Sequence, residues 1–516
     1  MSAYDKLLKI IPSVAEPKVY LSFKSRLKWT ALILVIFFVL GSITIYGAAQ
    51  QDYSRFLFFE LILGSKMGSI LTLGIGPIVM ASIILQLLVG SKIIPWDLKS
   101  PAGRARFQGT QKILTIFFCV FEAYAYVAFG AVNPIANTPG MIAILIGQLT
   151  LGGILVLFMD DVISKWGIGS GVSLFIAAGV SKSIFIGIFN PCAPIIGATG
   201  SISCGLPDPS AGQLPIGKLP QFISFMQLGE TSQAILAMLP VLATIIVFLV
   251  VIYIQAIKID IPLAFTTIRG FGRRWPLKFI YTSNIPVILA GALLANLHLV
   301  GPLLANRGIS IFGEFDSQGQ ATGGLSFFLS LPNTVSVQVF SLIMLAIVFI
   351  GAFSIFYFKL RDTKKIVIAS VVIGIILAYF TTASFVGLPG TLDFIRMATY
   401  LIFFTVFCTI FSVFWVNTSG MDADSVAEQI EGMGMQIPGF RRDPRIIREV
   451  LNRYIPVLAV LGGITIGLIA AVADFTSAIG TGTGILLTVM IIYNFYEIIA
   501  ARYVEEIHPS LRGFFR

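Results

Sequence analysis

Residues 53–80 read "YSRFLFFELILGSKMGSILTLGIGPIVM", a stretch that is apolar enough to enter a bilayer. Gly64, Lys66, Gly68 and the run "GIGP" at 74–77 interrupt it, and a helix that crosses a membrane disfavours such residues at its middle. We therefore interpret the stretch as two pieces. A short amphiphilic segment at about 55–67, too short to span, enters from the outside. The chain then breaks at the glycines and restarts as a spanning helix.

The composition of the whole chain is that of a membrane protein. Of its 516 residues, 56% are hydrophobic and only 12% are charged, whereas a soluble domain carries about 25% charged residues. We therefore predict an all-α integral membrane protein. Apolar runs near the ~20 residues that cross the hydrocarbon core predict about twelve spans, at 29–48, 70–90, 112–132, 140–159, 171–189, 234–256, 284–305, 336–358, 365–386, 395–416, 455–474 and 481–501.

The basic residues predict the orientation of these spans. Cytoplasmic loops carry an excess of Lys and Arg, and most of the 35 basic residues lie on one side when the N-terminus is cytosolic. We expect both termini in the cytosol. The net charge of +10 then reflects topology more than a nucleic-acid site.

Two pairs of segments resemble each other. "PIVMASIIL" (77–85) matches "PVILAGALL" (286–294), and "GIGSGVSLFI" (167–176) matches "GTGTGILLTV" (480–489). Within each pair the two members run in opposite directions across the membrane, which is typical of an inverted repeat with its function between the halves. Short apolar runs also match by chance, but two pairs in the same order favour the repeat. It predicts an N-terminal half at 1–190, an external loop at 191–233 and a C-terminal half at 234–516.

The chemistry of the spans favours a gated pore over a carrier or an enzyme. A transporter of polar solutes needs ionisable ligands near the midplane, and the candidates Glu122, Lys182, Arg396 and Glu497 lie mostly near span ends. The sequence offers no nucleophile constellation, metal cluster or phosphate-binding strand and turn, so we expect neither an enzyme nor a cofactor. Branched aliphatic residues beside Gly and Pro instead suggest a constriction that blocks ions by dewetting. A secondary transporter with an inverted repeat stays as the alternative.

Two cytosolic loops and one external loop leave questions open. The loops 257–283 and 417–454 are longer than a turn requires and are rich in Arg. They are either solvated basic flanks or a docking surface for an anionic partner, such as ribosomal RNA or an acidic protein surface. Cys192 and Cys204 share the external loop, where a disulfide and two free thiols are equally open.

Several longer stretches carry a specific resemblance. They are "LGIGPIVMASIILQLLVG" (73–90), "GRARFQGTQK" (103–112), "WGIGSGVSLFIAAGVS" (166–181), "YTSNIPVILAGALLAN" (281–296), "FWVNTSGMD" (414–422), "GFRRDPRIIREVLNRYIP" (439–456), "GTGILLTV" (482–489) and "EEIHP" (505–509). In this order they resemble the SecY family of protein-conducting channels, archaeal type. The resemblance implies ten spans in two inverted halves that open sideways to lipid. The run at about 335–390 is additional and reads as a two-span hairpin, for which we have no functional account.

The resemblance also implies roles for particular residues. An aliphatic pore ring would comprise Ile75, Val79, Val172, Ile176, Ile288 and Leu487, and a plug beneath it Phe58, Phe59, Leu61, Ile62 and Leu63. The lateral gate would comprise Glu122, Asn296 and Met80, the last at a position that is often Thr. Docking of a cytosolic partner would use Arg104, Arg269, Arg273, Arg274, Arg441 and Arg442.

The function implied is that of a passive channel. Its substrates would be secretory and membrane polypeptides, moved by a translating ribosome with the signal-recognition machinery or by another partner. A single-span SecE-like subunit and a SecBeta-like subunit would complete a heterotrimer in the plasma membrane. Aliphatic side chains suit this role because they pack around any passing polypeptide without requiring a hydrogen-bond partner.

Overall fold

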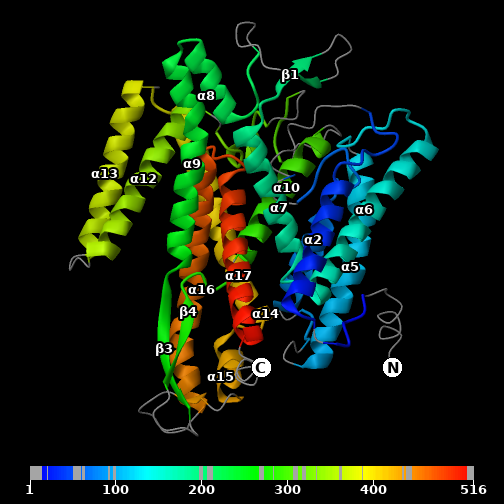
Figure 1. Cartoon of the computed structure of the whole chain (residues 1–516), viewed down its shortest axis with the longest axis vertical. Helices are drawn as coiled ribbons and strands as arrows, with labels where there is room; N and C mark the ends of the chain where they lie inside the picture. The colour runs from blue at the N-terminus through cyan, green and yellow to red at the C-terminus, as the bar shows by residue number, and fades with distance from the viewer. Residues whose placement is uncertain are drawn as a thin grey trace.

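The computed structural model of the chain has a helix in every one of the predicted apolar runs (Figure 1). Among the described residues, nine helices are long and apolar enough to cross a membrane, and the shorter apolar helices Gly76–Gly90 and Ile285–His298 add two. The helices of the bundle are α2 (Phe23–Leu40), α4 (Gly76–Gly90), α5 (Pro101–Ala128), α6 (Pro139–Trp166), α7 (Gly171–Phe189), α9 (Thr231–Gln255), α10 (Ile285–Ala305), α12 (Val335–Phe358), α13 (Thr363–Phe385), α14 (Thr391–Thr418), α16 (Pro444–Phe475) and α17 (Gly482–Ile507).

The structure describes most of the chain. The described ranges are 14–19, 21–49, 60, 64–90, 93–96, 100–128, 130–196, 202–205, 213–265, 272–282, 284–305, 312–316, 321–332, 334–358, 363–385, 387–432, 435–436 and 444–507.

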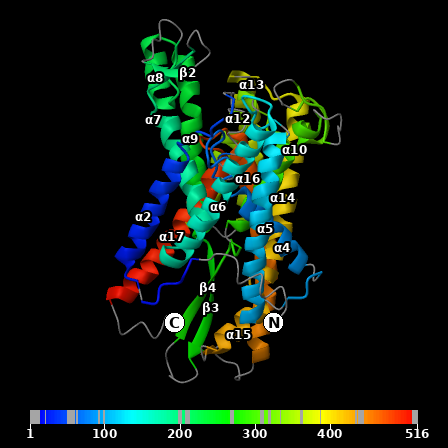
Figure 2. The same ribbon diagram turned by 90° about the vertical axis from the view of Figure 1, so that its right-hand side faces the viewer.

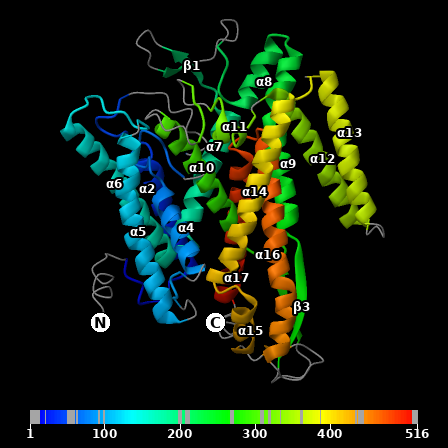
Figure 3. The ribbon, with the colours of Figure 1, turned by 180° about the vertical axis from the view of Figure 1, so that it is seen from behind.

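Two halves lie side by side in the bundle (Figure 3). Helices α2 and α4 to α7 form one half, and α9, α10, α14, α16 and α17 form the other. The segments that match in sequence also meet in space, since α7 packs along α17 and α4 contacts α10. Within the halves, α5 packs on α4 and α6 as α14 packs on α10 and α16. These contacts agree with the predicted inverted repeat.

Helices α14 and α16 pack closely because glycines remove side chains at their crossing. A Cβ on Gly463 would lie 2.8 Å from the Cα of Thr409, and one on Gly467 would lie 2.7 Å from the Cα of Thr405. Both contacts are shorter than real Cβ atoms allow. Small residues spaced four apart let membrane helices approach at backbone distance, so Gly463 and Gly467 determine this packing.

The loops 257–283 and 417–454, which the sequence predicts to be cytosolic, together build a small folded unit. Strands β3 (Lys258–Phe265) and β4 (Gly272–Lys278) form an antiparallel hairpin, and β5 (Met435–Gln436) pairs with β3. Helix α15 (Ala423–Gly432) and the start of α16 cover the sheet. The unit has its own buried apolar core, to which Leu263, Ile430 and Leu451 belong. These loops are therefore more than solvated flanks, which the sequence had left open.

The two ends of the bundle carry different structures. Strands β3 and β4 and helix α15 project from one end, where α2 begins and α17 ends (Figures 1 and 2). Helix α8 (Lys218–Gln227) and the hairpin of β1 (Ala193–Ile196) and β2 (Ile202–Gly205) lie at the other end. Cys192, just before β1, is disulfide-bonded. Cys119 and Cys408 are free, so Cys204 is the remaining cysteine of the chain, and the structure favours the disulfide.

The additional hairpin of α12 and α13 lies outside the two halves, next to α9 (Figures 1 and 3). Helix α12 packs on α9 and α16, and α13 packs on α12. The two helices approach closely at Gly351, where a Cβ would lie 2.3 Å from the Cβ of Ser370. Large apolar side chains of α13, such as Ile368 and Phe380, are exposed. They suit a surface that faces lipid.

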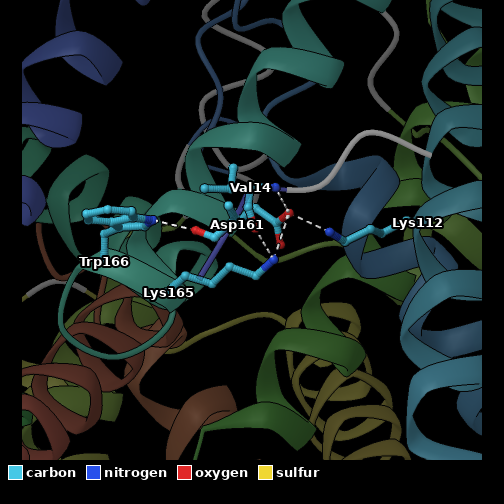
Figure 4. A network of polar contacts seen from close by, with 6 residues as sticks. Val14, Lys112, Asp161, Lys165 and Trp166 are labelled. Atoms are coloured by element: carbon cyan, nitrogen blue, oxygen red, sulfur yellow. Dashed lines mark hydrogen bonds and ion pairs between the residues drawn. The ribbon is translucent and has the colours of Figure 1, made fainter. Parts of the chain in front are cut away.

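A polar network holds the N-terminal segment against α5 and α6 of the first half (Figure 4). The carboxylate of Asp161 on α6 accepts a hydrogen bond from the Val14 backbone N–H at 3.4 Å and an ion-paired one from Lys112 on α5. Lys165 donates to the Val14 carbonyl, and the indole Nε1 of Trp166 donates to the Ala15 carbonyl at 2.8 Å. This network ties residues 14–15 to α5 and α6.

Candidate functional site

The broken stretch at 53–80 breaks where the sequence predicts. Gly64, Gly68 and Gly74 have φ of +53°, +76° and +51°, a left-handed region that glycine enters without strain. Helix α4 then begins at Gly76, and Pro77 lies in its first turn, where a missing N–H costs nothing. Lys66 is exposed, as expected for a charge outside the membrane core. The predicted plug residues Phe58, Phe59, Leu61, Ile62 and Leu63 lie outside the described residues.

The described end of this segment rests against α7. A Cβ on Gly64 would lie 3.4 Å from the carbonyl carbon of Phe175 and 3.6 Å from the backbone nitrogen of Ile176. The Oε1 of Glu60 accepts a hydrogen bond from the Met67 backbone N–H at 2.7 Å, which closes the segment into a loop. The end of the predicted plug segment is thus in backbone contact with a helix of the predicted ring.

The residues of the predicted ring lie in the interior, in or against one extended apolar cluster. Ile75, Ile176 and Leu487 have no exposed surface, Val79 is 4% exposed and Ile288 is 5% exposed. Val172 is half-buried and packs against the same apolar cluster. The six residues come from α7, α10, α17 and the start of α4, so both halves contribute. Such an aliphatic cluster can exclude water and ions while offering no ligand to a solute.

The three lateral-gate candidates are only partly joined. The Nδ2 of Asn296 on α10 donates to the Sδ of Met80 on α4 at 3.4 Å, and also to the Ala292 carbonyl at 2.8 Å. Glu122 on α5 is buried, with 8% of its surface exposed. The hydrogen bonds within the described part of the chain do not join Glu122 to Met80 or Asn296. Asn296 and Met80 are thus joined through a sulfur acceptor, which is weaker than an oxygen acceptor.

The other charged candidates in the spans have partners in the structure. Arg396, near the start of α14, donates to the carbonyl oxygens of Ser330 at 3.3 Å and Leu331 at 3.1 Å. Glu497 on α17 pairs with Lys278 on β4. The Nζ of Lys182 lies 5.6 Å from the ring centroid of Phe38. Among the described residues no cluster of three or more His, Cys, Asp or Glu could hold a metal ion. These placements offer little for binding a polar solute at the midplane.

The structure describes three of the six docking candidates. Arg104 on α5 is exposed. Arg273 and Arg274 lie on β4, opposite Leu263 and Pro262 of β3. Arg269, Arg441 and Arg442 lie outside the described residues. Sequence reasoning missed the Lys278–Glu497 ion pair, because residues 219 apart in the chain give no local signal of their contact.

Fold and composition together define a helical, multi-pass membrane protein built from two repeat-related halves that share an apolar interior. The chain belongs to the SecY family. The family model, described as SecY, matches residues 69–370 and 363–496.

Curated relatives and solved structures agree over nearly the full length. The protein translocase subunit SecY of Methanothermobacter thermautotrophicus is 39% identical over 515 residues, which cover 99% of this chain and 98% of the relative. That of Methanococcus vannielii is 38% identical over 508 residues, with 98% of each chain covered. A structure described as that of a protein conducting channel is similar with a TM-score of 0.76 at 37% identity, and covers 98% of both chains. Sec61 in a canine ribosome–channel complex is similar with a TM-score of 0.74 at 37% identity and the same coverage.

Proposed function

We propose that the chain is the central pore-forming subunit of a Sec protein translocase. It would conduct secretory polypeptides across the membrane and release membrane segments sideways into lipid. The observation that carries the proposal is the burial of the predicted ring residues: they come from both halves, and five of the six are almost fully buried. Aliphatic groups can yield to a polypeptide of any sequence, since they impose no hydrogen-bond geometry on it. The chain itself would catalyse no reaction.

The interface between α4 and α10 is the proposed route into lipid. Both helices carry ring residues, Val79 on α4 and Ile288 on α10, so their separation would open the ring and the bilayer side together. The hydrogen bond between Asn296 and Met80 would hold this interface shut at rest. The segment at about 55–67 would act as the plug, and its described end already contacts α7.

The proposed partners follow from the cytosolic surface and from the relatives. Basic residues on β4 and α5 would dock a translating ribosome or the signal-recognition machinery through anionic groups. The related Sec61 was solved in a ribosome–channel complex. A SecE-like and a SecBeta-like subunit would complete a heterotrimer. The proposed location is the plasma membrane, with both termini in the cytosol.

The secondary transporter is the weaker candidate. Its midplane would need groups that bind a solute, whereas Arg396 and Glu497 are already engaged near helix ends. The curated relatives are protein translocase subunits, which supports the channel over the transporter.

A photo-crosslinking experiment tests the proposal. A photoreactive residue at position 288 of the complete channel complex is illuminated while a ribosome holds a stalled secretory nascent chain. We expect a crosslink to the nascent chain. The matched control places the same residue at Ile373, which is 49% exposed on α13, and should crosslink to lipid. Crosslinks from position 288 to lipid or to other proteins only would refute the channel.

A further inference from the structure

Two carboxylates, the half-buried Asp160 and the buried Asp474, occupy equivalent places in the two halves. In the first half, the Oδ1 of Asp160 on α6 accepts a hydrogen bond from the Val172 backbone N–H at 2.9 Å. The Gly171 backbone N–H also donates to this carboxylate. These two N–H groups open α7, which begins at Gly171. Ser170, at the N-cap position, makes no side-chain capping bond. The cap of α7 is therefore supplied by the preceding helix.

The second half repeats the arrangement on the opposite side of the membrane. The Oδ1 of Asp474 on α16 accepts a hydrogen bond from the Thr483 backbone N–H at 2.7 Å, and the Gly482 backbone N–H donates to the same carboxylate. These groups open α17, which begins at Gly482. The Oδ2 accepts from the Thr483 hydroxyl and from the hydroxyl of Tyr400 at 2.8 Å. Asp474 is 5% exposed.

The turns before α7 and α17 are tight, so each carboxylate lies close to the first residues of the helix that it caps. A Cβ on Gly171 would lie 2.7 Å from the Cα of Asp160, and a Cβ on Gly482 would lie 2.0 Å from the carbonyl carbon of Ala473. The turn before α17 also contains Ser477 and Thr481 at φ of +50° and +61°, which are strained values for residues with a side chain. Glycine at both helix starts thus allows the close approach that the caps require.

Both capped helices carry residues of the proposed ring. Val172 and Ile176 lie in the first two turns of α7, and Leu487 lies in the second turn of α17. Helices α7 and α17 also pack against each other. A carboxylate at a helix N-terminus satisfies orphan N–H groups and interacts favourably with the helix dipole, and the effect is stronger where water is excluded. Each cap therefore fixes the position of a ring residue one or two turns away.

We infer that Asp160 and Asp474 are paired positioning residues of the channel. Each one locks a ring-bearing helix, α7 or α17, to the helix before it, one from the cytosolic side and the other from the external side. The ring then closes to the same diameter each time the channel returns to rest. This inference rests on the proposed function, because it takes Val172, Ile176 and Leu487 as parts of the constriction.

Resting ion conductance of the complete, reconstituted channel complex tests the inference. Asp160→Ala and Asp474→Ala should each raise the resting conductance by about tenfold, the population shift expected from the loss of one helix cap. Asp160→Asn and Asp474→Asn keep an oxygen acceptor, so their conductance should lie between those of the Ala variants and the wild type. If the Ala variants do not assemble, the Asn variants decide: a raised conductance supports the inference, and a wild-type conductance overturns it.

Matched controls separate positioning from general loss of stability. Asp161→Asn removes the neighbouring acid, whose bonds go to Lys112, Lys165 and Val14 rather than to α7 (Figure 4). Leu145→Ala creates a cavity at a fully buried site on α6. Both should keep the wild-type resting conductance, although the second lowers the unfolding temperature. An equal rise in conductance in these controls would show that the caps act through stability alone and would overturn the inference.

The same recordings distinguish this inference from the proposed function. A double variant with polar residues at Val79 and Ile288 tests the ring itself. If this variant leaks while Asp160→Ala and Asp474→Ala remain tight, the ring stands and the positioning role is wrong. If the ring variant also remains tight, the proposed constriction is wrong.

Discussion

The Nδ2 of Asn296 on α10 lies 3.4 Å from the Sδ of Met80 on α4, so a hydrogen bond to sulfur joins the two halves at their proposed lateral opening. Most of the other buried residues of α4 and α10 are apolar. A thioether is a weak acceptor, and its loss costs less than that of an oxygen acceptor. This relationship suits an interface that must separate and close repeatedly.

Replacing Met80 should change how readily this interface opens. Met80→Ala removes the acceptor, so the open fraction should rise about threefold, as expected for one weak net hydrogen bond. Met80→Thr offers a hydroxyl oxygen instead and should lower the open fraction. The measurement is the open probability of single channels during titration with a synthetic signal peptide. Met159→Ala, which truncates a buried methionine of α6, is the control and should leave this probability unchanged.

Polar residues in the ring should make the closed channel leak. In a double variant Val79→Asn and Ile288→Asn, hydrophilic groups would face each other at the constriction and favour a continuous column of water. We expect the resting ion conductance to rise by at least an order of magnitude in planar bilayers. Val247→Asn, at a fully buried position of α9 outside the ring, is the comparison and should destabilise without leaking. A tight double variant would remove Val79 and Ile288 from the constriction.

Deletion of the α12–α13 hairpin should spare the channel. The principal contacts of the hairpin run from α12 to α9 and α16, and the removal of two spans preserves the orientation of everything downstream. We expect near wild-type translocation of a secretory precursor into vesicles. Deletion of residues 335–360 alone leaves an odd number of spans, so α14 and the segments after it would invert or fail to insert. Loss of translocation in the full deletion, with the complex still assembled, would assign the hairpin an essential role.

The small folded unit of β3, β4, β5 and α15 should lose stability at high pH through Tyr281, which packs against its core. Its hydroxyl donates to the Met421 carbonyl at 2.8 Å. Burial, with a contribution from the nearby Asp422, raises the pKa of Tyr281 from its ordinary value near 10 to about 12. The unfolded chain therefore releases this proton near pH 10 while the folded chain keeps it to about pH 12. Stability is complete below pH 10 and falls as the pH rises between these values.

Thermal unfolding of the purified complex as a function of pH measures this effect. Tyr281→Phe should unfold at a lower temperature than the wild type near pH 8, since it lacks a hydrogen bond worth about 1 kcal/mol. The difference should shrink as the pH approaches 12. Tyr496→Phe, at an exposed position of α17, should follow the wild type throughout. A constant difference between Tyr281→Phe and the wild type across this range would contradict the assignment.

Hydropathy located the helices better than their ends. The predicted run at 171–189 coincides with α7, because the glycine-rich turn and Asn190 mark both of its ends. Helix α5 begins at Pro101 instead of near 112, and α16 begins at Pro444 instead of near 455. In both helices the extra turns carry several charged residues, and those of α16 also bury Ile447 and Leu451 in the core of the small folded unit. A hydropathy window detects the apolar part of a helix and does not detect the less apolar turns that continue from it.

Only those features of the candidate site that depend on local sequence could be predicted. The break at 64–77 follows from glycine and proline, and the aliphatic ring follows from motif position. The sheet of β3, β4 and β5 depends on contacts between segments that are far apart in the chain. The caps by Asp160 and Asp474 depend on contacts between two helices that a turn joins. An acidic residue near the end of one span, before a glycine-rich start of the next, is a signal that could have indicated those caps.

The placement of α12 and α13 also bears on the repeat. Between α10 and α14 this hairpin crosses the membrane twice, whereas the matching connection in the first half, from α4 to α5, is short and holds residues 91–100. The hairpin is therefore not part of the repeated unit. Each half is complete with five helices, and the symmetry between the halves holds without α12 and α13.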